Sequence, residues 1–143
     1  MVNQKMRRFN YIIGEIDNLY HEASVKLGLS DATMTILYVL SQNDDSCVQR
    51  DIYQLTGMTR QTVNSAVRKL VNEGIVATTA GEGRTVVVTL TPEGRKLAER
   101  TVHRILTMED EIFGTWTDEE IDFYLELTER YRDQIKDKIE KNL

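Results

Sequence analysis

Apolar residues recur at helical spacing along the first part of the chain. From about Gln4 to Val25 they return every three or four positions, which predicts a helix with one apolar stripe. Gly28 would end this helix, because glycine is favoured just after a helix C-terminus. Ser30 is a good N-cap for a second helix, with Leu29 and Met34 placed to pack together as a hydrophobic staple.

Two short helices follow the polar run at residues 43–46. The first extends from about Gln49 to Thr56, and we expect Ile52 and Leu55 to face inward. Thr59 caps the second, which runs to about Glu73 and has an apolar stripe on one side and a polar face on the other. Two short helices joined by a tight turn predict a helix-turn-helix.

The period of the pattern then changes from helical to alternating. Residues Ile75 to Thr79 and Thr85 to Leu90 are rich in β-branched side chains and predict two strands. The loop between them, residues 80–84, contains the glycines that a tight hairpin requires. A hairpin directly after a helix-turn-helix makes it a winged helix-turn-helix.

Two long helices are predicted after the hairpin. Thr91 and Pro92 supply a cap and a first-turn proline for a helix that extends to about Phe113. Residues 117–120 form a capping box for the last helix, which continues to about Lys141. The chain is therefore expected to be mainly α with a small β-hairpin wing.

The composition is that of a globular protein. Of 143 residues, 41% are hydrophobic and 29% are charged, which is ordinary for a soluble domain. There is no apolar run of the roughly 18 residues that a membrane span needs, and no signal peptide. The single cysteine, Cys47, cannot form an internal disulfide, which suits a reducing compartment. We therefore expect a cytoplasmic protein with no cofactor and no membrane partner.

The net charge of −5 is unfavourable for DNA binding only if it is spread evenly. It is not, because residues 47–95 carry a net charge of +2, while residues 1–46 carry −2 and residues 96–143 carry −5. The electrostatic footprint of a DNA-binding protein is local, so an acidic total is compatible with a DNA-reading centre.

The polar face of the helix after Thr59 has the chemistry needed to read DNA. An α-helix fits the major groove, where arginine suits guanine and asparagine or glutamine suits adenine. The amides at the helix N-terminus can also hold a phosphate. The helix has one acid, Glu73, at its far end. The candidate DNA-binding residues are Thr59, Arg60, Gln61, Thr62, Asn64, Ser65, Arg68, Lys69 and, in the hairpin loop, Arg84.

Three other interpretations are open. The polar face could be a merely solvated surface, although it favours Thr, Asn, Gln, Ser and Arg over Glu and Lys. The winged helix could serve only for protein–protein contact, which would predict an apolar or acidic face instead. An enzyme has little to work with, because the chain has two histidines, one cysteine, no nucleophile elbow and no phosphate loop.

The chain resembles the MarR family of winged-helix regulators over nearly its whole length. The strongest match is VQRDIYQLTGMTRQTVNSAVRKLVNEGIV followed by TVVVTLTPEGRKLA. In this family the helix ends in leucine, three residues, glycine and two apolar residues, as in residues 70–76. The wing then returns through a strand into Leu-Thr-x-x-Gly-Arg, which is residues 90–95 here.

The resemblance also implies a role for the loop of the wing. The family usually has an acid, one residue and then an arginine that enters the minor groove, and Glu82-Gly83-Arg84 aligns with that pattern with Glu in place of the usual Asp. A narrow minor groove attracts arginine. Glu82 would support the wing by holding the Arg84 side chain in place.

The resemblance implies a homodimer built from the terminal helices. Residues 1–30 and 92–143 would form the helical dimerisation region, and residues 31–91 the embedded winged helix-turn-helix domain. Long helices with aromatic and aliphatic stripes also need a partner surface in their own right. A two-fold dimer would read a pseudo-palindromic operator in double-stranded DNA, with half-sites about one helical turn apart.

Regulation by a small molecule is a further implication. Relatives often bind small aromatic or anionic effectors between the dimerisation region and the winged domain, which suggests a ligand-responsive repressor. The residues that could line such a pocket are Tyr11, Tyr20, His21, Met34 and Tyr38, although core or interface roles fit each of them too. Oxidant sensing by Cys47 is disfavoured by the nearby Asp44 and Asp45. The spacing of the histidines and the cysteine matches no metal site.

Overall fold

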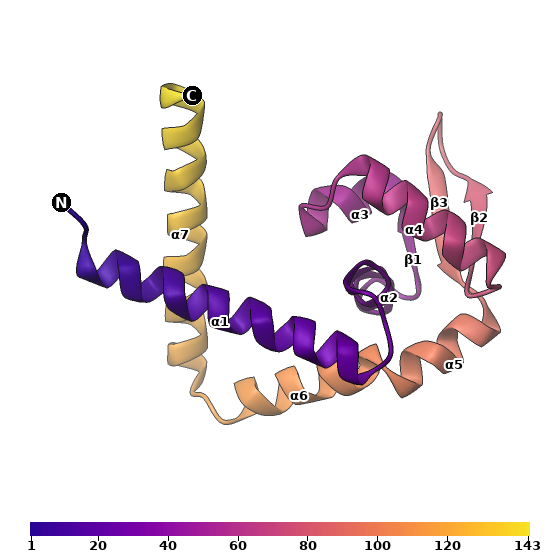
Figure 1. The fold of residues 1–143 in the computed structure, drawn as a ribbon, viewed down its shortest axis with the longest axis horizontal. Coiled ribbons are helices and arrows are strands. Elements are labelled where there is room, and N and C mark those ends of the chain that lie inside the picture. Colours follow the sequence, from indigo (N-terminus) through magenta and orange to yellow (C-terminus); the bar gives the residue numbers. More distant parts are fainter. The chain divides into compact units, whose positions relative to one another are not determined.

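The computed structural model describes residues 1–143 and has seven helices and three strands (Figure 1). The chain divides into two compact units, Met1–Arg104 and Ile105–Leu143. The elements are α1 (Gln4–Lys26), α2 (Asp31–Gln42), β1 (Ser46–Val48), α3 (Gln49–Thr56), α4 (Arg60–Asn72), β2 (Val76–Ala80), β3 (Val86–Leu90), α5 (Pro92–Arg100), α6 (Val102–Gly114) and α7 (Asp118–Asn142). The expected fold class, mainly helical with a small β wing, is confirmed. None of the helices is long and apolar enough to cross a membrane.

Five helices begin at a side-chain cap: Asn3 caps α1, and four further caps follow along the chain. Ser30 accepts a hydrogen bond from the amide of Thr33 at 3.1 Å, which begins α2. Thr59, Thr91 and Thr117 cap α4, α5 and α7 in the same way. These last four are the caps that the sequence predicts, and each satisfies an amide that the helix itself leaves without a partner.

The core of the first unit forms around α2, which contacts α1, α3, α4, α5, β1 and β3. Ile36, Leu37 and Leu40 of α2 are fully buried. The residues that pack against them from the other elements include Ile52, Val63, Val67, Leu70, Val76, Val88, Leu90, Ala98 and Val102. One apolar cluster therefore holds the two short helices and the sheet in a fixed relation.

The sheet has three strands rather than the predicted two. β3 lies in the middle and pairs in antiparallel fashion with β2 on one side and β1 on the other. Val88 faces Cys47 of β1 and Thr78 of β2 in the register. β1 is only three residues long and shows no alternation of apolar and polar side chains, so the sequence pattern could not predict it.

The expectation that Leu55 faces inward is wrong. Ile52 is fully buried, but Leu55 is 64% exposed. Gln49, Asp51, Tyr53 and Thr56 of the same helix are half-buried, and Ile52 is its one buried residue. The apolar spacing of Ile52 and Leu55 therefore does not by itself predict which of them packs against the core.

The single long helix predicted from Pro92 to Phe113 is also wrong, because the chain leaves helical geometry at Thr101. Thr101 has φ −125° and ψ −92°, and its amide donates to the carbonyl of Ala98. Its hydroxyl donates to the carbonyl of Leu97 at 2.7 Å, so the side chain replaces a helical backbone bond. The break has no glycine or proline to mark it in the sequence.

The segment Leu-Thr-x-x-Gly-Arg forms the junction between the wing and α5. The Thr91 amide donates to the carbonyl of Ile75 at 3.0 Å, and its hydroxyl lies 2.6 Å from the carbonyl oxygen of Gly74. Gly94 lies so close to the chain that a Cβ there would be 2.0 Å from the Ile75 carbonyl oxygen. Arg95 forms an ion pair with Asp45 at 3.2 Å, between α5 and the turn that precedes β1. The contacts of Thr91, Gly94 and Arg95 therefore explain why the motif has a threonine, a glycine and an arginine at these positions.

The second unit consists of α6 from Ile105 onward and the whole of α7. Thr117 and Glu120 form the predicted capping box, in which the Thr117 amide donates to the Glu120 carboxylate at 2.9 Å. Ile121 is half-buried, while the Trp116 ring packs against Phe113 and, edge-on, against Tyr124. No residue of α7 is buried.

Candidate nucleic-acid interface

One side of α4 is anchored in the core and the opposite side is open to solvent. Val63, Val67 and Leu70 form the anchored stripe, and none of them is more than 4% exposed. All nine candidate DNA-binding residues are exposed: Thr59, Arg60, Gln61, Thr62, Asn64, Ser65, Arg68, Lys69 and Arg84. The polar face that the sequence predicts is thus available to a ligand along the whole helix.

The N-terminus of α4 is suited to an anionic ligand. The Thr59 hydroxyl accepts from the Thr62 amide at 3.1 Å and donates to the Thr62 hydroxyl at 2.7 Å. The amides of Arg60 and Gln61 donate no hydrogen bond within the chain. There is no acid in the first turn, so the positive end of the helix dipole is not neutralised.

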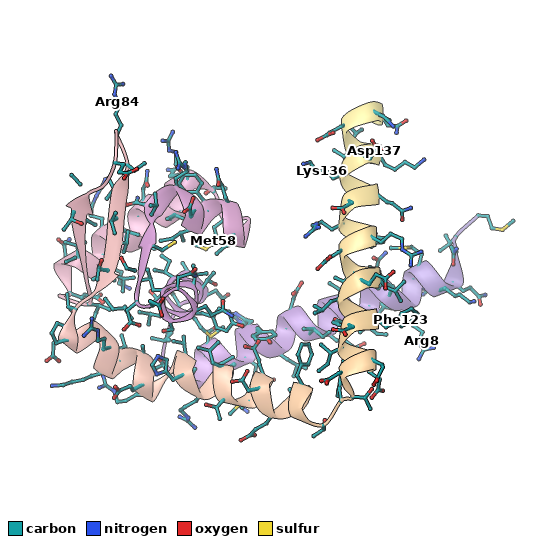
Figure 2. All side chains as sticks on the ribbon, turned by 180° about the vertical axis from the view of Figure 1, so that it is seen from behind. Arg8, Met58, Arg84, Phe123, Lys136 and Asp137 are labelled. Atoms are coloured by element: carbon teal, nitrogen blue, oxygen red, sulfur yellow. The ribbon has the colours of Figure 1, made fainter.

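The turn before α4 holds this N-terminus in place. Gly57 ends α3 with φ +71°, the left-handed conformation that glycine adopts without strain. The Thr56 hydroxyl donates to the Ile52 carbonyl at 2.6 Å and accepts from the Met58 amide at 3.2 Å. Met58 itself packs against the core (Figure 2). The turn is therefore fixed on both sides of the glycine.

Two residues of α3 that the sequence pattern does not single out contact the exposed face of α4. The Gln49 side-chain amide donates to the Asn64 side-chain oxygen at 2.6 Å. The Tyr53 ring lies under the guanidinium of Arg60, 5.9 Å from its centroid. The first pair is 15 positions apart in the sequence and the second is seven apart, so a local sequence pattern does not predict either contact.

The remaining polar residues of α4 differ in how free they are. Lys69 forms an ion pair with Glu73 at 3.9 Å, between two exposed side chains. Such a pair is worth little in water and can open when a phosphate competes for the lysine. Gln61, Ser65 and Arg68 have no side-chain partner within the chain. Arg68 is therefore a cation without a competing acid.

The hairpin presents Arg84 at its tip (Figure 2). Gly81 donates from its amide to the carbonyl of Thr85 at 2.9 Å, and the Thr85 hydroxyl donates to the carbonyl of Glu82 at 2.6 Å. These bonds close the loop. The Glu82 carboxylate forms no ion pair with Arg84, so the contact of Glu82 with the rest of the wing is through its backbone. Arg84 is fully available to a ligand.

The five candidate effector residues lie in different surroundings. Tyr11 is 58% exposed on α1, and its hydroxyl accepts a hydrogen bond from the Arg7 guanidinium. Tyr11 also lines a surface depression of about 290 Å³. Tyr20 and His21 are also exposed, and His21 contacts Asp31 at 2.8 Å. Met34 is part of the core, and Tyr38 is half-buried against it. Their role in effector binding stays a prediction.

Cys47 lies half-buried in β1. Burial raises the pKa of its thiol, and the nearby carboxylate of Asp51 raises it further. The acidic neighbour that matters in space is thus Asp51, rather than the sequence neighbours Asp44 and Asp45. No group of three or more His, Cys, Asp or Glu side chains is arranged to hold a metal ion.

Comparison with known proteins agrees with this arrangement. Residues 27–84, from the end of α1 to Arg84 of the hairpin loop, match the sequence profile of the MarR family. No curated protein matches the chain in sequence.

The solved structures extend the likeness to the whole chain. A MarR family regulator from Neisseria meningitidis has a TM-score of 0.86 at 21% identity, over 99% of this chain and 100% of the other. A MarR family transcriptional regulator from Silicibacter pomeroyi has a TM-score of 0.70 at 25% identity, over 89% and 86%. The PcaV transcriptional regulator from Streptomyces coelicolor, solved with its natural ligand, has a TM-score of 0.64 at 19% identity, over 93% and 96%. The family profile thus matches the helix-turn-helix and the start of the wing, and over its whole length the chain shares the fold of MarR family transcriptional regulators.

Proposed function

We propose that this protein is a ligand-responsive transcriptional repressor that binds a pseudo-palindromic operator as a homodimer. In this proposal α4 lies in the major groove and the hairpin loop follows the adjacent minor groove. The nine exposed candidates on these two elements supply the contacts to bases and phosphates. Residues 31–91 would form the DNA-binding domain, and the segments before and after it, residues 1–30 and 92–143, would form the dimerisation region.

The observation that supports this most is the composition of the exposed surface of α4 and the hairpin tip. Arg60, Arg68 and Arg84 have no ion-pair partner there, and the one acid near them on α4, Glu73, lies beyond the last turn. Exposed cations without partners bind phosphates at little cost, because no existing ion pair has to be broken. A protein-contact surface would instead present mainly apolar or acidic side chains, whereas the one exposed apolar side chain of α4 is Val71, near its C-terminus.

The test is to select DNA fragments with the purified protein and then to measure affinity for the selected sequence by gel shift. Arg84→Ala and Arg68→Ala should each weaken binding, by about tenfold for a lost contact worth roughly 1.4 kcal/mol. If Arg68 contacts a phosphate, its removal should also lower the slope of log K against log salt by about 0.9.

The matched control is Arg100→Ala, because Arg100 is an exposed arginine on α5, away from both DNA-reading elements. It should leave affinity within about twofold of the wild type. Unchanged affinity in both Arg84→Ala and Arg68→Ala would exclude this contact scheme. If the protein enriches no DNA sequence, the alternative is a winged-helix module for protein–protein contact.

Support for a homodimer comes from the long helices of each unit. In α1, Phe9, Ile12, Ile13 and Ile16 are 39–44% exposed although they form its apolar stripe. In α7, Phe123, Leu127, Tyr131 and Ile135 are 40–59% exposed. Contiguous apolar surface of this kind is uncommon on a monomer and usually marks an interface.

Control by a ligand is supported by likeness alone. PcaV, which shares the fold, was solved in complex with its natural ligand. We propose a small aromatic or anionic effector for this protein as well, with Tyr11, Tyr20, His21, Met34 and Tyr38 as candidates for its site. A screen of such compounds against the protein–DNA complex should find one that releases the DNA. Transcription in vitro from a template with the selected operator should decrease when protein is added and recover with that compound.

A further inference from the structure

The two helices of the helix-turn-helix contact each other through a pair of matched positions. Gln49 and Tyr53 are four residues apart and lie on one face of α3. Arg60 and Asn64 are four residues apart and lie on the exposed face of α4. Gln49 contacts Asn64 and Tyr53 contacts Arg60. Two residues that face the DNA in the proposed function are therefore held by two residues of the neighbouring helix.

The contact between Gln49 and Asn64 gives the Asn64 amide a direction. The Asn64 oxygen accepts the hydrogen bond from Gln49 at 2.6 Å, so the oxygen is turned toward α3. The nitrogen of the Asn64 amide, with two hydrogens to donate, has no partner in the chain. While Gln49 donates to this oxygen, Asn64 presents its amide nitrogen, which is a donor, to a base.

The contact between Tyr53 and Arg60 limits the directions of the guanidinium. Arg60 lies over the ring at 5.9 Å, within the range in which a cation is attracted to the face of an aromatic ring. Arg60 has no carboxylate partner that competes with this position. The ring therefore reduces the freedom that Arg60 loses when it binds a guanine.

Both supporting residues are themselves fixed. Gln49 follows directly after β1, whose last residue, Val48, pairs with Val87 of β3. Tyr53 is half-buried and packs against the core next to Ile52. The backbone at Gln49 is thus tied to the sheet, and the Tyr53 ring is tied to the core.

We propose that Gln49 and Tyr53 are positioning residues that determine which bases Asn64 and Arg60 prefer. Asn64 prefers a base edge that presents an acceptor and no donor, which is guanine with N7 and O6 or thymine with O4. Arg60 is pre-oriented for the bidentate edge of guanine. This inference rests on the proposed function, because it concerns the bases that α4 reads.

The sharpest test is Gln49→Glu, because a carboxylate can only accept hydrogen bonds. The Asn64 amide must then turn over to donate to the introduced carboxylate, which leaves its oxygen toward the DNA. The preferred base at one position of each half-site should change from one that presents an acceptor to one that presents a donor, adenine N6 or cytosine N4. The change in relative affinity should be on the order of tenfold at that position and small elsewhere.

A matched control separates this effect from added charge. Gln54→Glu makes the same substitution at an exposed position of α3 without a contact to Asn64. It should weaken binding by the same factor for all sequences and leave the selected motif unchanged. Gln49→Met, which removes the hydrogen bond at similar size, should broaden the preference at the Asn64 position without reversing it.

The second arm concerns the tyrosine. Tyr53→Phe keeps the ring and should keep the selected motif. Tyr53→Leu removes the ring and should reduce the preference for guanine at the Arg60 position severalfold, with the other positions unchanged. Thermal unfolding of both variants shows whether the protein remains folded at the assay temperature.

The outcomes distinguish this inference from the function on which it rests. If the wild-type protein selects no DNA motif, both fail. If it selects a motif and Gln49→Glu selects the same one with uniformly lower affinity, the positioning role of Gln49 is wrong while DNA binding stands. A motif that changes with Gln54→Glu as much as with Gln49→Glu would also overturn it.

Discussion

Single residues determine how closely the wing and α5 approach each other. Thr91 binds carbonyl groups at the end of α4 through both its amide and its hydroxyl, and Gly94 leaves room for the Ile75 carbonyl. Arg95 adds an ion pair to the half-buried Asp45, and because Arg95 is exposed to solvent such a pair contributes about 1 kcal/mol or less. Loss of the close approach at Gly94 should therefore lower the free energy of unfolding more than loss of the Arg95 ion pair.

Gly94→Ala should destabilise the protein by roughly 1–3 kcal/mol or more, because a Cβ would lie 2.0 Å from the Ile75 carbonyl oxygen. The measurement is urea unfolding at neutral pH. Gly114→Ala is the control, since a Cβ at Gly114 would meet nothing within 4 Å. Equal unfolding midpoints for the two variants would contradict the close approach.

The thiol of Cys47 should react slowly with alkylating reagents. Its pKa is raised by burial and by Asp51, so a smaller fraction is thiolate at a given pH than for a free cysteine. Iodoacetamide at a mildly alkaline pH should modify native Cys47 more slowly than the same cysteine in urea. Asp51→Asn should increase the native rate modestly. A native rate equal to the unfolded rate would show that the thiol is neither buried nor raised in pKa.

At the scale of elements, α1 is tied to α2 by a small polar cluster. The Ser24 hydroxyl is buried and donates to the Asp31 carboxylate, and His21 contacts the same carboxylate at 2.8 Å. These hydrogen bonds, with that of Ser24 the larger cause, lower the pKa of Asp31 below its ordinary value of 3.8. A carboxylate with a lowered pKa favours the folded state when it is ionised.

This cluster predicts a pH dependence for Asp31→Asn. Because the folded pKa is depressed, the contribution of Asp31 to stability is present above pH 3.8 and is lost as the pH falls through the lowered pKa. The variant should be less stable than the wild type at neutral pH, and the difference should shrink in acid. Urea unfolding across this range measures it, with Asp17→Asn, an exposed carboxylate of α1, as the control. A difference that does not change with pH would exclude the carboxylate as its source.

The elements that carry local signals could be predicted from the sequence, and those that depend on tertiary contacts could not. Ser30, Thr59 and Thr117 each combine a capping side chain with a following apolar stripe, so the helix starts were clear. The break at Thr101 and the strand β1 have no such signal, because one depends on a threonine hydroxyl and the other on pairing with β3.

The candidate site shows the same division. Exposure of the α4 face followed from its period, since residues opposite a buried stripe must face water. The contact of Glu82 with Arg84 was implied by a resemblance alone and stays a prediction, while the loop itself is closed by backbone bonds and by the Thr85 hydroxyl. Gln49 and Tyr53 were not found, because their partners lie on another helix.

At the scale of the whole molecule, each of the two units has a long helix, α1 or α7, whose apolar side chains are exposed. No residue of α7 is buried, and in α1 only Ser24 is. Helices in water derive most of their stability from packing of such faces. In the proposed homodimer a second copy supplies the cover.

Sedimentation should therefore show a dimer, and a charge within the apolar faces should disrupt it. Ile16→Glu in α1 and Leu127→Glu in α7 should each weaken dimerisation by about tenfold or more, because an unpaired carboxylate would be buried in the interface. Leu55→Glu is the control, since Leu55 is 64% exposed on α3 and lies on neither long helix. A wild-type monomer at micromolar concentration would rule out the dimer and the two-fold operator with it.

The pairing of β1 with β3 has a consequence for the kind of duplex that the protein can recognise. β1 leads directly into α3, and β3 is a strand of the hairpin, so the arm that carries Arg84 and the helix-turn-helix move as one body. In the proposed complex α4 and the hairpin loop are therefore held at a fixed separation, α4 for the major groove and the loop for the minor groove. An A-form duplex has a deep, narrow major groove and a wide, shallow minor groove. An RNA–DNA hybrid of the operator sequence would therefore be rejected on shape, even though its bases carry the same sequence.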